Sequence, residues 1–189
     1  MKTVALCIGH SRFIKGKRDG GAVSVGGVNE WTYNSELADM IQHRLETMGI
    51  ASKIYDEYVG EGYTSAMKWL AYQLDRDNVD AAVELHFNSA GPDATGHEWL
   101  YWHSSQKAFD LAVKADHETR RLVPGFKARG TKPLSSGSRG AEFCRLTPCP
   151  AIITEPFFGS NKADWDIAVN NKEEIAEAIA LSLAQVKDW

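Results

Sequence analysis

Four side chains of this sequence, His10, Glu30, His86 and Glu155, are of the types that bind a metal ion or carry a proton. Two neutral imidazoles and one carboxylate suit Zn²⁺ and leave its fourth position open to water. Such an ion lowers the pKa of the water and polarises a carbonyl, and both effects are useful for amide hydrolysis. A further carboxylate must then carry the water proton to the leaving amine. We expect His10, Glu30 and His86 to be the ligands and Glu155 to carry the proton.

Three of these residues lie where apolar segments end. His10 follows Thr3–Ile8, His86 lies near the end of Asp80–Phe87, and Glu155 follows Ala151–Thr154. In open α/β sheets ligands bind at the carboxyl ends of the strands, so we expect the three side chains at one sheet edge. Glu30 follows a stretch rich in Gly, Asp and Ser, His10 to Asn29, and lies near the start of the first long helix. From that position the Glu30 side chain can reach the same edge of the sheet.

Each candidate taken alone has a structural explanation. The intervals between them are long, and a single His on a strand is commonly a core or surface residue. Glu30 could be a solvated first-turn carboxylate that the helix dipole favours. A charge that closes a buried strand needs a reason, so Glu155 is harder to explain away. The other histidines are expected at the surface: His43, His97, His103 and His117.

The remaining pattern predicts helices between and after the strands. Their buried faces are Leu37, Ile41, Leu45 and Met48; Met67, Leu70 and Leu74; Leu111, Ala115 and Leu122; and Ile175, Ile179, Leu183 and Val186. Asn171 and Glu174 resemble a capping box for the last helix. Ala51–Tyr55 and a more exposed His97–Trp102 add strands, and Pro124–Ser138 is expected to be irregular. Strands alternating with helices predict an α/β fold with a twisted, mostly parallel sheet flanked by helices.

Composition narrows the class of protein. A chain of 189 residues without internal repeat or linker predicts a single domain over 1–189. The net charge of −4 gives no pull toward nucleic acid. No apolar run approaches the roughly 18 residues that span a bilayer, so we expect no membrane insertion. The apolar run Thr3–Ile8 is shorter than that of a signal peptide, which predicts synthesis in the cytoplasm without an export signal.

The three cysteines make an odd count and no disulfide framework, which fits a reducing compartment. Cys7 lies in an apolar run and is expected in the core. A bridge between Cys144 and Cys149 stays open as the less favoured alternative.

Four segments, in order, resemble the zinc-dependent N-acetylmuramoyl-L-alanine amidases of bacterial autolysins and phage endolysins. They are the strand Val4–His10 ending in Gly-His; Asp19–Ala22 through Gly27–Glu30, with Asn34 beyond it; Glu84–Ser89, similar to a strand ending in H-x-N-A; and Pro150–Phe158 with Ser160, Asn161 and Asp164. The resemblance covers nearly the whole chain.

The resemblance implies one Zn²⁺ held by His10, Glu30 and His86, with Glu155 as the catalytic carboxylate. The implied substrate is peptidoglycan, cut at the amide between the lactyl group of N-acetylmuramic acid and the L-alanine of the stem peptide. We expect a monomer. A phage endolysin that reaches the wall after release by a holin fits best, and a bacterial enzyme is the alternative.

The sequence also departs from the family pattern. Ser11, Arg12 and Phe13 stand where further glycines are common, and Glu84 stands where a small residue is usual. Since side chains at i and i+2 share a strand face, Glu84 should point the same way as His86. Glu84 either accepts a hydrogen bond from the imidazole of a metal ligand and so orients it, or it is paired with another group. Asn88, Arg129 and Arg139 are further candidates, either for supporting a metal ligand or for contacting substrate. The two arginines could alternatively be solvated loop residues.

Two rival functions remain open. A zinc peptidase would use the same ligands on a bond within the stem peptide. A non-catalytic amidase-like module would bind wall precursors, although intact candidates at all four positions argue against it.

Overall fold

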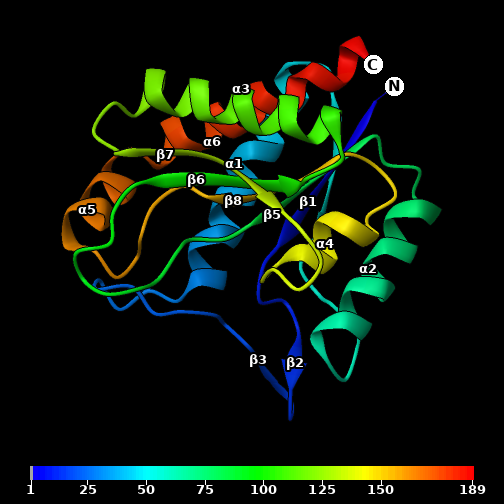
Figure 1. Cartoon of the computed structure of the whole chain (residues 1–189), viewed down its shortest axis with the longest axis horizontal. Helices are drawn as coiled ribbons and strands as arrows, with labels where there is room; N and C mark the ends of the chain where they lie inside the picture. Colours follow the sequence, from blue (N-terminus) through cyan, green and yellow to red (C-terminus); the bar gives the residue numbers. More distant parts are fainter. Residues whose placement is uncertain (1) are drawn as a thin grey trace.

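The computed structural model describes residues 2–189, which form a six-stranded sheet, a small hairpin and helices on both sheet faces (Figure 1). The elements run β1 Thr3–Ile8, β2 Phe13–Ile14, β3 Lys17–Arg18, α1 Glu30–Thr47, β4 Ala51–Tyr55, α2 Tyr63–Arg76, β5 Ala81–Leu85, β6 His97–Trp102, α3 Gln106–Leu122, β7 Ala128–Leu134, α4 Ala141–Leu146, β8 Ala151–Glu155, α5 Lys162–Asn170, α6 Lys172–Leu183 and a closing 3₁₀ turn, Ala184–Asp188.

The strand order in the sheet is β4-β1-β5-β8-β6-β7. β4, β1, β5 and β8 are parallel, β6 pairs antiparallel with β8, and β7 runs parallel to β6. This is the mostly parallel α/β sheet that the sequence predicts. Because β1, β5 and β8 are adjacent and parallel, their carboxyl ends lie at one edge.

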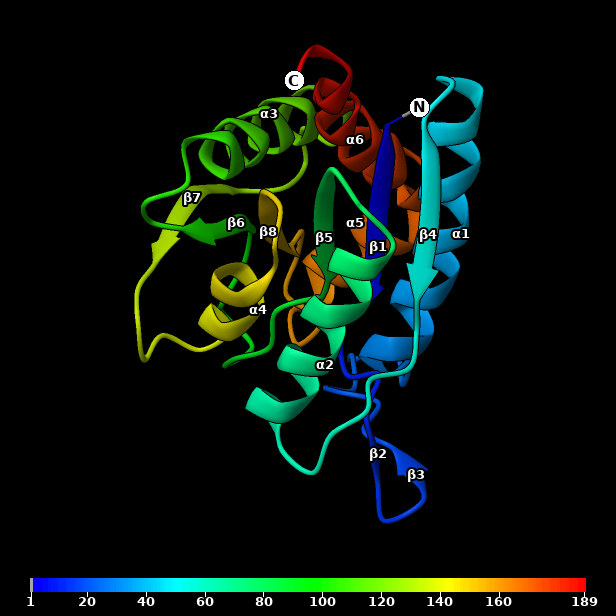
Figure 2. The same cartoon turned by 90° about the vertical axis from the view of Figure 1, so that its right-hand side faces the viewer.

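Alternation along the strands builds a separate core on each face. In β1, Val4, Leu6 and Ile8 pack under α1, α3 and α6, whereas Ala5 and Cys7 pack under α2 and α4. Figure 2 shows the two layers of helices with the sheet between them, and the hairpin β2–β3 projecting beyond the carboxyl ends of the strands. Buried on both faces, the central strands read as continuous apolar runs.

Two expectations about local structure are wrong. Part of Pro124–Ser138 is the edge strand β7, which the sequence hides because Gly130 adopts a positive φ and Pro133 is tolerated only at an edge. The predicted capping box is absent, since the amide of Asn171 donates to the oxygen of Ile167 at 2.9 Å and serves the end of α5 instead.

Of the four histidines outside the candidate site, one differs from the expected surface position. His43, His103 and His117 are exposed, as expected. His97 is fully buried, and its Nε2 lies 2.9 Å from Asp116 Oδ1, because β6 is covered by α3.

The three cysteines, Cys7, Cys144 and Cys149, are free thiols. Within residues 2–189, no helix has the length and apolar character needed to cross a bilayer.

Candidate metal centre and active site

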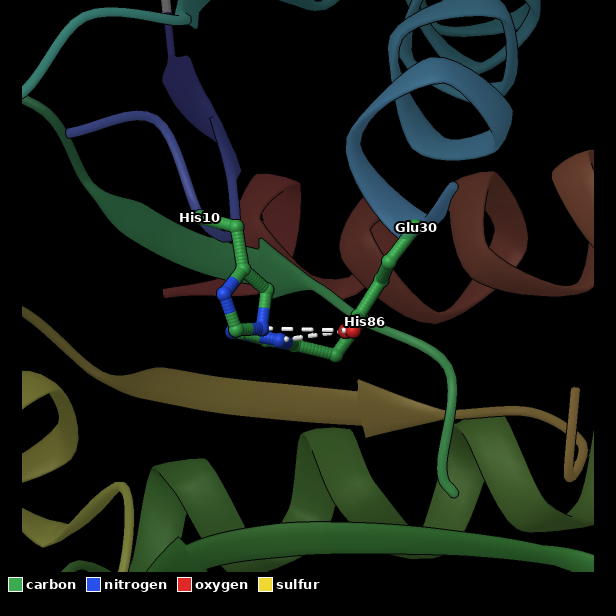
Figure 3. Close-up of side chains that lie close together, drawn as sticks. All are labelled: His10, Glu30 and His86. Carbon is green, nitrogen blue, oxygen red and sulfur yellow. Dashed lines mark hydrogen bonds and ion pairs between the residues drawn. The ribbon is translucent and has the colours of Figure 1, made fainter. Parts of the chain in front are cut away.

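His10, Glu30 and His86 converge at the carboxyl edge of the sheet. Figure 3 shows the Glu30 carboxylate, carried by α1, pointing at imidazoles that follow β1 and β5. Glu30 Oε2 lies 3.2 Å from His10 Nε2, and Glu30 Oε1 lies 2.8 Å from His86 Nδ1. All three ligand atoms lie within 4.8 Å of one another.

This donor set fits zinc. Ligand atoms about 2.1 Å from one tetrahedral ion are about 3.4 Å apart, and the Glu30 oxygens lie 3.2 and 2.8 Å from the two imidazole nitrogens. Two nitrogens and one oxygen are the donors zinc prefers, and three protein ligands leave a position for water or substrate. The structure therefore brings together the three residues that the sequence nominates.

Glu30 is held in place by its backbone neighbours. Asn29 caps α1 by accepting from Thr32 N at 2.8 Å, which places Glu30 at the first helical position. The Glu30 carboxylate accepts from Ala22 N and Phe87 N, both at 3.1 Å. Only 3% of the residue is exposed, so a solvated first-turn carboxylate is excluded.

Two glycines make room for the imidazoles. A Cβ on Gly9 would lie 2.2 Å from His86 Cε1, and one on Gly21 would lie 2.6 Å from His10 Cδ2. His10 itself has φ 60°, a left-handed conformation that is uncommon outside glycine. Such strain is characteristic of functional sites, where the surrounding structure maintains it.

The three candidate ligands perturb one another's protonation. Burial opposes ionisation of both histidines, but the hydrogen bond and charge of Glu30 outweigh it and raise the pKa of His10. The pKa of His86 is raised further, because Glu84 as well as Glu30 faces it. Burial acts against ionisation of Glu30 too, and its hydrogen bonds to His10 and His86 nevertheless lower its pKa. The centre is thus a carboxylate between two imidazoles that readily take up protons.

Each imidazole also has a carboxylate on its far side. His10 Nδ1 lies 3.2 Å from Asp19 Oδ2, and His86 Nε2 lies 3.3 Å from Glu84 Oε2. Of Glu84's two predicted roles, the orienting acceptor is therefore the one the geometry favours. Asp19 was recognised in the sequence only as part of a motif, since nothing local reveals its contact with His10.

Glu155 ends β8 beside this centre. Its Oε2 is buried and has no hydrogen-bond partner among the described residues. Burial, together with the negative charges of Glu30 and Glu98, raises the pKa of Glu155 to about 8, although His86 and Arg139 act in the opposite direction. A carboxyl group with a pKa near neutrality can both accept and release a proton at physiological pH.

A cavity of about 560 Å³ joins Glu155 to the three candidate ligands. It is lined by all four of them and by Arg12, Asp19, Tyr58, Tyr63, Glu84, Asn88, Glu98, Leu100 and Arg139, among others. Volumes of this order accommodate a drug-sized ligand. Tyr58, Tyr63 and Glu98 are lining residues that sequence reasoning missed, because tertiary contacts alone bring them to the edge.

The three further candidates, Asn88, Arg129 and Arg139, have different surroundings in the structure. Asn88 lines the cavity and donates to Glu98 Oε1 at 2.9 Å. Arg129 lies in β7 outside the cavity lining, and its Nε donates to Glu98 Oε2 at 2.7 Å, so its surroundings favour a supporting role over direct substrate contact. Arg139 lines the cavity and has no ion pair among residues 2–189, so its contact with substrate stays a prediction.

Comparisons with known proteins identify a matching family and similar folds. The family model described as N-acetylmuramoyl-L-alanine amidase matches residues 4–185. A comparison with curated protein sequences found no match.

Solved structures with similar folds were found as well. The catalytic domain of the CD27L endolysin targeting Clostridia difficile has a TM-score of 0.80 at 25% identity, with 97% of each chain covered. The CwlD amidase from Clostridioides difficile, solved in complex with the GerS lipoprotein, has a TM-score of 0.83 at 20% identity, covering 100% of this chain and 99% of that one. The amidase AmiC2 of Nostoc punctiforme has a TM-score of 0.80 at 22% identity, covering 100% and 98%.

A family match that spans nearly the whole chain, and a fold shared with several solved amidases, assign the protein to a family. The chain belongs to the N-acetylmuramoyl-L-alanine amidases, enzymes that cleave peptidoglycan.

Proposed function

We propose that this amidase is zinc-dependent and cuts the bond between the lactyl group of N-acetylmuramic acid and L-alanine, with Glu155 as general base and acid. One observation carries the proposal. The His10–Glu30–His86 cluster and the buried, unpartnered Oε2 of Glu155 line one cavity. A metal-binding cluster and a separate proton carrier are the two components of metal-assisted amide hydrolysis by water.

His10, Glu30 and His86 would hold the ion. When bound, zinc supplies Lewis acidity to the scissile carbonyl and to a water molecule. Glu155 accepts a proton as the water oxygen bonds to the carbonyl carbon, and it returns that proton to the nitrogen as the C–N bond breaks. The products are the carboxylate of the lactyl group and the free amine of L-alanine. Arg139 and Asn88 line the cavity wall, which supports a role for both in orienting the stem peptide.

The biological setting is also a proposal. Similarity to an endolysin catalytic domain supports a phage endolysin that is made in the cytoplasm and reaches the wall after holin-type release. We further propose that the enzyme acts as a monomer, which sedimentation velocity will check. Co-expression with a holin should lyse cells if the endolysin setting is correct, whereas a lack of lysis by an active enzyme would contradict it.

The decisive experiment is digestion of purified sacculi with wild type, Glu155→Ala and His86→Ala, each with and without chelator. Wild type should release free stem peptides and leave peptide-free glycan, as read by mass spectrometry. Glu155→Ala should bind zinc but lose hydrolysis, and His86→Ala should lose both. Cleavage within the stem peptide would favour a zinc peptidase. Hydrolysis that survives exhaustive chelation would overturn the zinc mechanism.

A further inference from the structure

Glu84 and His86 stand two residues apart at the end of β5, on the sheet face covered by α2 and α4. His86 lies between two carboxylates, since its Nδ1 faces Glu30 Oε1 at 2.8 Å and its Nε2 faces Glu84 Oε2 at 3.3 Å. Nδ1 of His86 therefore faces the cluster of candidate ligands, and Nε2, on the opposite side of the ring, faces Glu84.

The backbone of Glu84 is fixed on both sides. In the parallel ladders, Glu84 is paired with Cys7 of β1 and with Ile153 of β8. A residue in the middle of a sheet has little backbone freedom, so the point from which the carboxylate extends toward the imidazole is fixed.

The burial of Glu84 calls for an explanation. The residue is only 2% exposed, and within residues 2–189 its one ion-pair partner is His86. Its neighbours are the ionisable but uncharged groups Tyr58 and Cys144, whose pKa values its charge helps to raise after burial itself. Burying a carboxylate without Lys or Arg is costly unless another group stabilises the charge.

His10 offers a comparison within the same centre. Its Nε2 faces Glu30 and its Nδ1 faces Asp19, so both imidazoles are placed between Glu30 and an outer carboxylate. The side chain of Asp19 is 32% exposed, whereas that of Glu84 is 3% exposed. The Asp19 contact is a hydrogen bond and the Glu84 contact is an ion pair, and an ion pair is less screened in the drier environment of Glu84.

We infer that Glu84 is a positioning residue that holds His86 with Nδ1 toward the metal site, and thereby raises the zinc affinity of the protein. It accepts the Nε2 proton of His86, which selects the tautomer whose lone pair is on Nδ1. An acceptor on the far nitrogen also makes the imidazole a better donor to the ion. The inference rests on the proposed zinc dependence and extends it to a residue at which this sequence departs from its family.

Zinc affinity, measured by competition with a chromophoric chelator, tests the inference without any substrate. Glu84→Gln keeps an acceptor oxygen but loses the charge, and Glu84→Ser removes the carboxylate and leaves a hydroxyl oxygen two bonds closer to the backbone, with a shorter reach toward His86. Glu118→Gln is the control: Glu118 is also buried, 4% exposed, and lies 3.3 Å from His117, but it belongs to α3 on the other sheet face and also pairs with Lys114 and Arg121. Measurement at pH 8.5 limits the competition of protons for the imidazoles.

We expect zinc to bind about 10- to 100-fold more weakly to Glu84→Ser, the usual cost of losing an outer partner of a metal ligand. Glu84→Gln should fall between Glu84→Ser and wild type, and Glu118→Gln should bind zinc as wild type does. Melting temperatures of the metal-free variants distinguish positioning of His86 from a purely structural role of Glu84. A purely structural role would lower the melting temperature and leave zinc affinity unchanged. Wild-type affinity in Glu84→Ser, or in Glu84→Gln should the serine variant not fold, would overturn the inference.

The measured zinc affinity of the Glu84 variants does not depend on whether the proposed hydrolysis is correct. If wild type and variants bind zinc equally well, the inference about Glu84 fails while zinc-dependent hydrolysis stands. If wild type binds no zinc at all, the proposed function fails first.

Discussion

Glu98 and Glu155 stand directly opposite each other on the antiparallel strands β6 and β8, and both line the cavity. Like charges placed opposite one another destabilise a sheet. The two carboxylates are treated differently: Glu98 accepts from Asn88 at 2.9 Å and from Arg129 at 2.7 Å, whereas Glu155 Oε2 has no partner in the described part of the chain. Glu155 therefore lacks the hydrogen-bond donors that Glu98 has, and its own pKa is raised by burial and by the nearby negative charges.

This arrangement predicts that Glu98→Gln lowers the pKa of Glu155. That pKa is about 8 because of burial and the charges of Glu30 and Glu98, so neutralising Glu98 should reduce it by about one unit. Carboxyl ¹³C NMR of the metal-free protein measures the shift, with Glu118→Gln as a distant control. An unchanged pKa in Glu98→Gln would mean that burial and the charge of Glu30 account for the raised pKa without Glu98.

The raised pKa of Glu155 also predicts how stability depends on pH. Between pH 4.5, the ordinary value for this group, and about 8, the folded protein holds a proton that the unfolded chain has lost. The contribution of Glu155 to stability therefore falls as pH rises through this window. In the metal-free protein, Glu155→Gln should raise the free energy of unfolding at pH 9 by a few kcal/mol, on the order of the shift converted to energy. Urea unfolding at pH 4.5 and pH 9 measures this. A stabilisation equal at both values would contradict the assignment.

Zinc affinity should rise with pH because His10 and His86 have raised pKa values in the metal-free protein. Both imidazoles must lose a proton to bind a metal, so binding near pH 6.5 should release more than one proton. Calorimetry in two buffers with different ionisation enthalpies counts the protons released. Binding that releases none would show that the histidines are already neutral, or that they are not ligands.

Gly9→Ala should weaken zinc binding and hydrolysis together. The new Cβ would lie 2.2 Å from His86 Cε1, and the ring has no free direction to move because Glu30 and Glu84 hold it from either side. We expect a loss of about 10- to 100-fold in zinc affinity, comparable to losing a partner of a ligand. Gly91→Ala is the matched control, since a Cβ at Gly91 meets nothing within 4 Å. Equal zinc affinity in the two variants would show that His86 tolerates displacement.

Much of the fold could be predicted from local patterns. Thr3–Ile8 and Ala51–Tyr55 form strands with the expected bounds, since strand and helix periodicities depend on neighbouring residues alone. The strand β7 was missed because it lies at an edge, where glycine, proline and charged residues obscure the alternation. His97 was misplaced because its burial depends on α3, an element that follows it in the sequence.

The sequence alone determined that His10, His86 and Glu155 emerge from the ends of apolar strands, because a strand and its end are local properties. Only the tertiary structure decided which groups these side chains meet. The insertion of Glu30 between two imidazoles and the pairing of Glu98 with Glu155 depend on strand order and register, whereas the shared strand face of Glu84 and His86 follows from their spacing. Strand order and register are set by packing between segments distant in the chain, so no local pattern specifies the pKa of Glu155 or the environment of His86.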